Sequence, residues 1–180
     1  MQGLGITIES NVTDTVKKLG DAKLTRFGVL LRQIGEIYLR HEKALFANKS
    51  GRKSAKESPW KDLKASYKDV KRKRWGKVYP TLVASGELAE SFSKEGAPYN
   101  VFVLGPSYAR FGSTHPLARY HQDGHSRGVY PARPMVYESP SLEGRINKKI
   151  SFFYTRLLKD AGLAVSGNTT DDGMKGAFEG

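Results

Sequence analysis

Two long stretches of the chain carry apolar residues at helical spacing. Between Asp21 and Ala47 these residues recur at intervals of three, four and seven (Leu24, Phe27, Leu31, Ile34, Tyr38 and Leu45). From residue 142 to about 162 they recur at intervals of three and four (Leu142, Ile146, Ile150, Phe153 and Leu157). Such spacing places the residues on one face of a helix, so both stretches are predicted to be amphipathic helices.

Shorter elements are predicted between these helices. Ser58 and Pro59 suit the first turn of a helix, with a buried stripe at Leu63, Tyr67 and Val70. Further short helices are expected after Ser85 and from Pro116 to Gly124. An apolar strand is expected at Asn100–Gly105, with a partner strand that ends at a turn within residues 93–99. Arg133–Tyr137 is expected to form a last, edge strand.

The order of these elements favours an α+β fold, in which long N-terminal and C-terminal amphipathic helices pack on a small antiparallel sheet with extended basic and polar loops. A chain of 180 residues fits one domain. We expect this domain to span residues 1–162, with a flexible basic loop at 48–57 and a flexible tail at 163–180.

Positive charge is concentrated in one segment. The formal net charge is +12, and the segment from Arg40 to Pro80 holds fourteen Lys or Arg against four Asp or Glu, or 14 − 4 = +10. Six cations within and beside the densest run are candidate contacts for DNA or an acidic partner: Lys68, Lys71, Arg72, Lys73, Arg74 and Lys77. A solvated or subunit-facing patch is the equally weighted alternative.

Residues for catalysis or metal binding are sparse. The chain has no cysteine, and its four histidines lack metal-ligand spacing, with only Asp123 near three of them. No phosphate-binding loop or serine-nucleophile motif is present. We therefore expect neither an enzyme nor a cofactor; His121 with Asp123 is the best candidate pair for a nuclease or peptidase. No run is long enough to cross a bilayer, and the N-terminus lacks the pattern of a signal peptide, which predicts a soluble, cytoplasmic protein.

A series of short elements occurs in a fixed order between residues 58 and 134: SPWKDL, LVASGEL, VFVLG, YA, YHQDG and PARP. In this order they resemble the phage virion morphogenesis family, the tail-completion proteins of Mu-like contractile-tailed phages, over about residues 58–158. Met135 departs from the family pattern, which has an aromatic after PARP, and residues 111–117 form an insertion before YHQDG.

This resemblance implies a structural virion protein of the phage neck. It would form a ring, with a hexamer expected, that completes or terminates the tail around the DNA channel and is built in the host cytoplasm. Its implied partners are other copies of itself, neighbouring neck and portal-connector proteins, the tail tube or sheath, and genomic DNA. The alternative is a non-specific nucleic-acid-binding protein, because tryptophan and tyrosine are interleaved with the basic segment.

The motif residues are expected to have structural or subunit-interface roles: Trp60, Leu63, Gly86, Leu88, Tyr108, Ala109, Tyr120, His121, Gly124, Pro131, Arg133 and Pro134. Gly86 and Gly124 suit turns or caps with positive φ. The planar guanidinium of Arg133 could clamp a carboxylate or carbonyls across a subunit boundary.

Overall fold

The computed structural model describes residues 4–9, 21–48, 60–124 and 131–160. Within these ranges the elements follow in the order β1 (Leu4–Glu9), α2 (Asp21–Ala47), α3 (Ala65–Trp75), α4 (Glu87–Ser93), β2 (Asn100–Leu104), β3 (Tyr108–Ser113), α5 (Pro116–Asp123) and α6 (Pro140–Asp160). The α+β class is confirmed, as are the two long helices. The predicted loop at 48–57, apart from residue 48, lies outside the described residues, as do the predicted helix start at Ser58 and the tail at 163–180.

The sheet is antiparallel, and its strands lie in the order β1–β3–β2. In the central strand β3, Phe111 is paired with Ile6 of β1 and with Phe102 of β2. The prediction that residues 93–99 form the partner of β2 is wrong. The chain turns there, with φ of +75° at Gly96 and +64° at Tyr99, and β3 is the partner.

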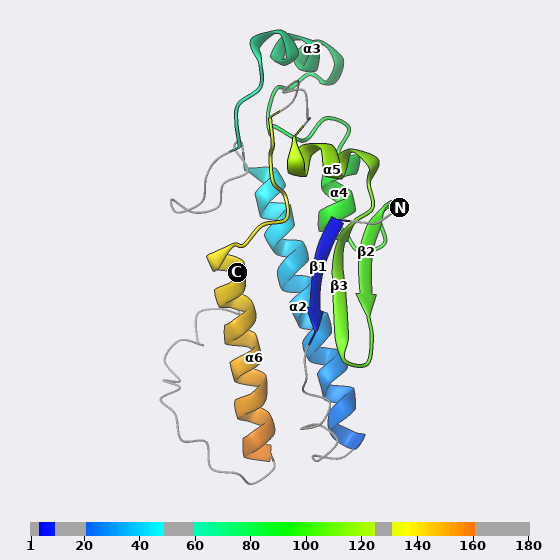
Figure 1. Ribbon diagram of the computed structural model, residues 1–180, viewed down its shortest axis with the longest axis vertical. Coiled ribbons are helices and arrows are strands. Elements are labelled where there is room, and N and C mark those ends of the chain that lie inside the picture. Colours follow the sequence, from blue (N-terminus) through cyan, green and yellow to red (C-terminus); the bar gives the residue numbers. More distant parts are fainter. Residues whose placement is uncertain (1–3, 10–20, 49–59, 125–130, 161–180) are drawn as a thin grey trace.

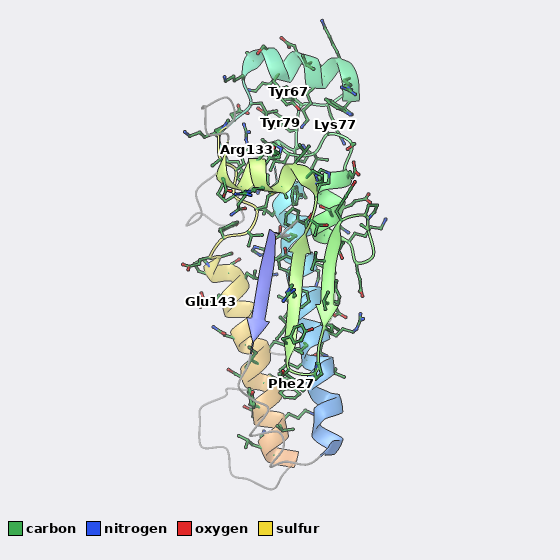
Figure 2. The ribbon with its side chains drawn as sticks, turned by 45° about the vertical axis from the view of Figure 1, so that its right-hand side comes forward. Phe27, Tyr67, Lys77, Tyr79, Arg133 and Glu143 are labelled. Carbon is green, nitrogen blue, oxygen red and sulfur yellow. The ribbon has the colours of Figure 1, made fainter. Side chains whose placement is uncertain are left out.

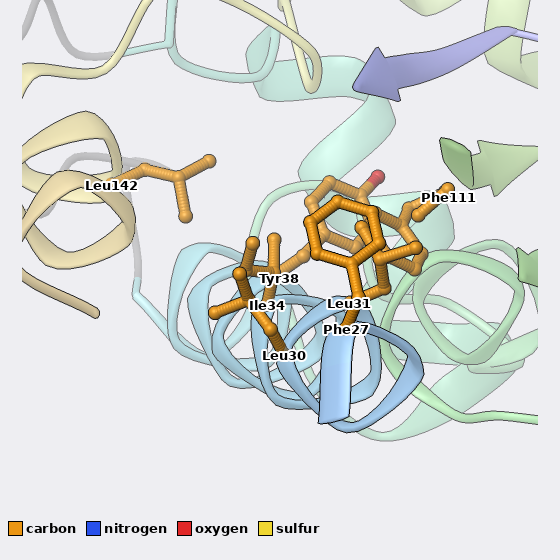
Figure 3. Packing of buried hydrophobic residues seen from close by; sticks show 8 residues of the cluster. Phe27, Leu30, Leu31, Ile34, Tyr38, Phe111 and Leu142 are labelled. Atoms are coloured by element: carbon orange, nitrogen blue, oxygen red, sulfur yellow. The ribbon is translucent and has the colours of Figure 1, made fainter. Parts of the chain in front are cut away.

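Helix α2 runs along the sheet, and α6 lies beside α2 in the opposite direction (Figure 1). The first core cluster fills the space between them: Phe27, Leu30, Leu31, Ile34, Tyr38, Ala109, Phe111 and Leu142 (Figure 3). The rings of Tyr38 and Phe111 stack with centroids 5.6 Å apart. The helical stripe predicted for α2 is therefore the face that packs on the sheet.

Gly35 brings the sheet close to α2. A Cβ atom built on Gly35 would lie 2.5 Å from ring carbons of Phe102 and 2.8 Å from a ring carbon of Phe111. The same atom built on Gly28 would meet nothing within 4 Å. Close packing against the sheet therefore explains the glycine at position 35, but it does not explain the glycine at position 28.

A second core cluster surrounds the C-terminal end of α2: Leu45, Phe46, Trp60, Leu82, Leu88, Phe92, Ala118 and Met135. The ring of Phe46 lies 5.8 Å from the ring of Trp60 and 5.8 Å from that of Phe92. Residues from many separate segments thus meet here. This cluster joins α2 to α4, to α5, to the chain on either side of α3 and to the chain around Met135.

Helix α3 begins at Ala65, seven residues later than the predicted cap at Ser58. Leu63 is buried as expected, but it precedes the helix. Tyr67 and Val70, the other members of the predicted buried stripe, are exposed. The side chain on the buried face of α3 is Lys71.

The predicted edge strand Arg133–Tyr137 is also absent from the described part of the chain. The amides of Met135 and Val136 bond the side-chain oxygen of Gln122, and the amide of Arg133 bonds the carbonyl of His121. Helix α5, and not a neighbouring strand, therefore satisfies this backbone.

Candidate assembly surface

A partly buried hydrogen bond joins Trp60 to the PARP segment. The indole Nε1 of Trp60 donates to the carbonyl of Pro134 at 2.7 Å. The Arg133 side chain, only 4% exposed, donates from Nε to the carbonyl of Lys61 at 2.9 Å and from Nη2 to that of Asp62 at 3.2 Å. The predicted carbonyl clamp therefore lies within one chain and does not cross a subunit boundary.

Gln122 of α5 completes this arrangement. Its Oε1 accepts from the amides of Met135 at 2.9 Å and Val136 at 3.1 Å, and its Nε2 donates to the carbonyl of Val136 at 2.5 Å. We call Trp60, Gln122, Arg133 and Pro134 the Trp60 cluster. Three of the motif elements thus meet in one hydrogen-bonded unit.

His121 lies beside the Trp60 cluster, and the amide of Arg133 donates to its carbonyl. Burial, with the nearby charges of Arg133 and His115, lowers the pKa of His121 to about 4, so the ring is neutral at pH 7. Asp123 is exposed, and its carboxylate lies 3.8 Å from the guanidinium of Arg119. Within the described residues, no group of three or more His, Cys, Asp or Glu could hold a metal ion.

The segment from Trp60 to Thr81, which we call the tip, forms one end of the molecule (Figure 1). It carries two acids, Asp62 and Asp69, and eight cations, giving 8 − 2 = +6: Lys61, Lys64, Lys68, Lys71, Arg72, Lys73, Arg74 and Lys77. The tip is therefore the most basic part of the described structure.

Lys71 is a structural residue of the tip. Its side chain is 1% exposed, and its ammonium donates to the carbonyls of Val78 at 2.8 Å, Pro80 at 2.6 Å and Thr81 at 3.1 Å. Burial, with the nearby charges of Lys77 and Arg133, lowers the pKa of Lys71 to about 8. The sequence included Lys71 among the candidate DNA contacts, and its burial removes it from that set.

Two other cations of the tip are paired with carboxylates. The ammonium of Lys68 lies 2.7 Å from Asp62, whose carboxylate also accepts from the hydroxyl of Tyr79. These hydrogen bonds, with the amide of Leu63, lower the pKa of Asp62 to about 2. Arg72 lies 2.8 Å from the carboxylate of Asp69, an exposed pair.

Three of the candidate contacts remain available on the tip surface. Lys73, Arg74 and Lys77 are exposed and form no salt bridge with any residue that the structure describes. The guanidinium of Arg74 lies over the ring of Trp75, 4.9 Å from its centroid. Figure 2 places Lys77 and Tyr67 at this end of the molecule.

Large apolar side chains are also exposed on several of the described elements. Of nine such residues in the described ranges, seven lie between residues 67 and 120: Tyr67, Val70, Tyr99, Val103, Tyr108, Leu117 and Tyr120. Tyr108 and Tyr120 belong to the motif elements. Tyr67 and Val70 were expected to be buried, and the sequence did not mark Tyr99, Val103 or Leu117 as contacts.

The other motif residues take scaffold positions. Gly86 caps the N-terminus of α4 with φ of +102°, and Gly124 ends α5 with φ of +77°. Both glycines therefore have the positive φ that was predicted for them. Leu63, Leu88 and Ala109 are buried. Pro131 is half-buried, whereas Pro134 is exposed although its carbonyl accepts the Trp60 bond.

The sequence was compared with models of known protein families. The model of the phage virion morphogenesis family matches residues 8–151, which is most of the chain. The chain belongs to the phage virion morphogenesis family. The resemblance stated from the short motifs is thereby confirmed, while the link to Mu-like phages stays a prediction. Searches of curated proteins and of solved structures found no match.

Membership in the phage virion morphogenesis family indicates a structural or assembly role in the phage and an association with the virion. Families of this kind are typically structural. The matched range includes every element of the Trp60 cluster and the tip. None of the described helices is long and apolar enough to span a membrane.

Proposed function

We propose that this protein is a ring subunit of the phage neck, which completes or terminates the tail and joins it to the head connector around the DNA channel. The observation that carries the proposal is the exposure of Tyr99, Leu117 and Tyr120 beside His115 and α5. Grouped apolar exposure of this kind marks protein interaction sites. In a protein with a structural or assembly role, such sites serve binding to other subunits.

The edges of the sheet support assembly as well. Strands β1 and β2 flank β3, so within the described residues neither outer edge has a neighbouring strand. Strand β2, Asn100–Leu104, contains no charged residue. Monomeric proteins usually protect an open edge with charges or a covering element. We expect six copies in the ring, bounded by the portal connector on one side and the tail tube or sheath on the other.

Deleting the gene from the phage tests this function. We expect particles in which filled heads and tails accumulate separately, and purified protein should restore joining when it is added to the lysate. Antibody labelling or electron microscopy should then locate the subunit at the neck. Normal infectious particles without the protein, or a label elsewhere in the virion, would refute the proposal.

Non-specific binding to DNA is a second candidate function, favoured by the free cations of the tip. Lys73, Arg74 and Lys77 are exposed and form no described salt bridge, and Lys61 and Lys64 are exposed beside them. Phosphate contacts from five such cations would give a plot of log affinity against log salt with a slope of about −4 to −5.

Titration of a labelled DNA duplex at several salt concentrations tests this second function. Triple replacement of Lys73, Arg74 and Lys77 by Gln should weaken binding and flatten the salt slope by about 3. A variant with the same charge change on α6, at Lys148, Lys149 and Arg156, is the matched control. Negligible affinity of the wild-type protein at low salt would remove DNA binding as a function.

A further inference from the structure

Helix α3 presents a mixed apolar and cationic stripe at the tip. Tyr67, Val70 and Arg74 follow one another at spacings of three and four, so they lie on one side of the helix. Tyr67 is 43% and Val70 51% exposed, and Arg74 is exposed as well. Lys77 follows just after the helix. We call these four residues the α3 stripe.

Lys71 fixes the orientation of the α3 stripe. Its ammonium is bound by three carbonyls of the chain between Val78 and Thr81, so the face of α3 that carries Lys71 packs on the protein. Tyr67 and Arg74 border this face, and Val70 lies further round the helix. The helix cannot rotate to bury Val70 without breaking these bonds. Exposure of Val70 is therefore built into the tip.

A second apolar patch lies around His115, where α4 and α5 meet. The His115 ring lies 5.1 Å from the ring of Tyr99, its Nδ1 accepts from the amide of Leu117, and its Nε2 lies 4.0 Å from the carboxylate of Glu87. Leu117 is 50% exposed, and Tyr120, one turn further along α5, is 55% exposed. We call Tyr99, Leu117 and Tyr120 the α5 patch.

The rim of the α5 patch contains acids. Glu87 lies beside His115, and Glu90 follows it by one turn on α4. Lys94 lies 3.6 Å from Glu90 across an exposed pair. Exposed pairs of this kind contribute little, so Glu90 can exchange its partner for another cation at small cost.

We propose that the α3 stripe of one copy docks on the α5 patch of a second copy, with Tyr67 and Val70 against the apolar patch and Arg74 and Lys77 against Glu87 and Glu90. This inference rests on the proposed ring. The α3 stripe contributes two cations, and the rim of the α5 patch contributes Glu87 and Glu90 beside the cations Lys94 and Arg119. Pairing of opposite charges across such a contact selects partners and orientation. Contact between two α3 stripes would instead bring the cations Arg74 and Lys77 of both copies together, and contact between two α5 patches would bring their acids together.

The two surfaces belong to different elements of one chain, so the contact is heterologous. Each copy can bind one neighbour through its tip and another through its α5 patch, and such contacts generate a ring when the rotation closes. DNA could contact Arg74 and Lys77 through its phosphates. It would offer no apolar surface to Val70 and would leave the α5 patch unoccupied.

Cysteine cross-linking tests the contact directly, because the wild-type chain has no cysteine. Both Val70 and Leu117 are exposed, so Val70→Cys and Leu117→Cys should leave the fold intact. A chain with both changes, treated with a short bifunctional thiol reagent at a concentration where it is assembled, should give a ladder of oligomers up to the closed ring. Each single variant should give at most a dimer. The pair Val29→Cys and Leu117→Cys is the control, since Val29 is 54% exposed but lies on α2.

Charge exchange gives a second, independent test. Arg74→Glu and Glu87→Lys, each alone, should raise the concentration needed for assembly by about tenfold or more, because each places like charges together. Combining the two should restore assembly. Circular dichroism of each variant checks that the fold is kept.

The outcomes separate this inference from the proposed function. If wild-type protein assembles while the double-cysteine chain gives no ladder and the charge variants assemble normally, the ring stands and this interface is wrong. If the wild-type protein stays monomeric in solution and in virions, the ring itself is wrong, and the inference falls with it.

Discussion

Replacement of Lys71 by Met should loosen the tip while leaving the rest of the fold intact. Methionine fills a similar volume but donates no hydrogen bond, so the carbonyls of Val78, Pro80 and Thr81 lose their donor. Only Thr81 is fully buried, whereas Val78 and Pro80 are half-buried and their carbonyls can regain water.

The size of the effect follows from this difference. A buried carbonyl without a donor costs about 1–3 kcal/mol, and the two carbonyls nearer the surface cost less. Removing a buried ammonium relieves its desolvation, which offsets part of the loss. The expected net loss is about 2–4 kcal/mol of local stability, which corresponds to roughly 30-fold to 800-fold faster amide exchange at about tenfold per 1.4 kcal/mol.

Hydrogen–deuterium exchange resolved by peptide measures this prediction, since local opening of α3 need not change global unfolding. Exchange should accelerate in residues 65–81 and stay unchanged in α2 and α6. Lys73→Met is the matched control, because it removes the same charge from an exposed neighbour. Equal exchange of α3 in the two variants would refute the structural role of Lys71.

Three further predictions concern the core and pH. Gly35→Ala should lower the unfolding free energy by about 1–2 kcal/mol in urea titration, because overpacking against Phe102 outweighs the gain in helix propensity. Gly28→Ala should raise the unfolding free energy by up to about 1 kcal/mol, because the space around position 28 is open. Trp60→Phe should cost about 1 kcal/mol in the same assay by removing the indole donor of a partly buried hydrogen bond, and an unchanged midpoint would contradict this. The pKa of His121 is lowered to about 4 in the folded protein, so the unfolded chain binds more protons between pH 4 and 6.5. The unfolding free energy should therefore fall as the pH falls through this window. His121→Gln should remove this part of the pH dependence, which amounts to at most about 3 kcal/mol.

The long helices could be predicted because their apolar period is sustained over many turns. In α2 the same spacing that predicts the helix also selects the buried face, with Phe27, Leu31 and Ile34 in the core. The start of α3 could not be found in this way. The chain from Trp60 to Asp62 is held by Arg133, more than seventy residues away, and no local pattern encodes that bond.

The sheet was predicted only in part for a similar reason. The apolar run Asn100–Leu104 indicates a strand by itself. Its partner Tyr108–Ser113 contains Arg110 and Gly112, which weaken its strand pattern, so register with β2 and β1 decides its structure. Pairing between strands is a tertiary property, and short segments predict it poorly.

The candidate site shows the limit of inference from charge. Lys71 and Lys73 stand two residues apart in one basic run, but the first is buried and the second is exposed. The difference arises from three carbonyls between Val78 and Thr81, which fold back on one side of α3. Composition predicts that the segment is basic, and only the fold decides which cations can meet a partner.

The ordered motifs and the candidate contacts are largely different residues, and this has a consequence for experiments on assembly. The motifs of Trp60, Gln122 and Arg133 meet in a buried cluster that holds the tip against α5. Changes there would disturb the tip and the α5 patch together, and the loss of assembly would follow from loss of structure. Changes at Val70 or Leu117 leave these hydrogen bonds in place. Defects in assembly can therefore be assigned to a contact only when they arise from exposed positions outside the Trp60 cluster.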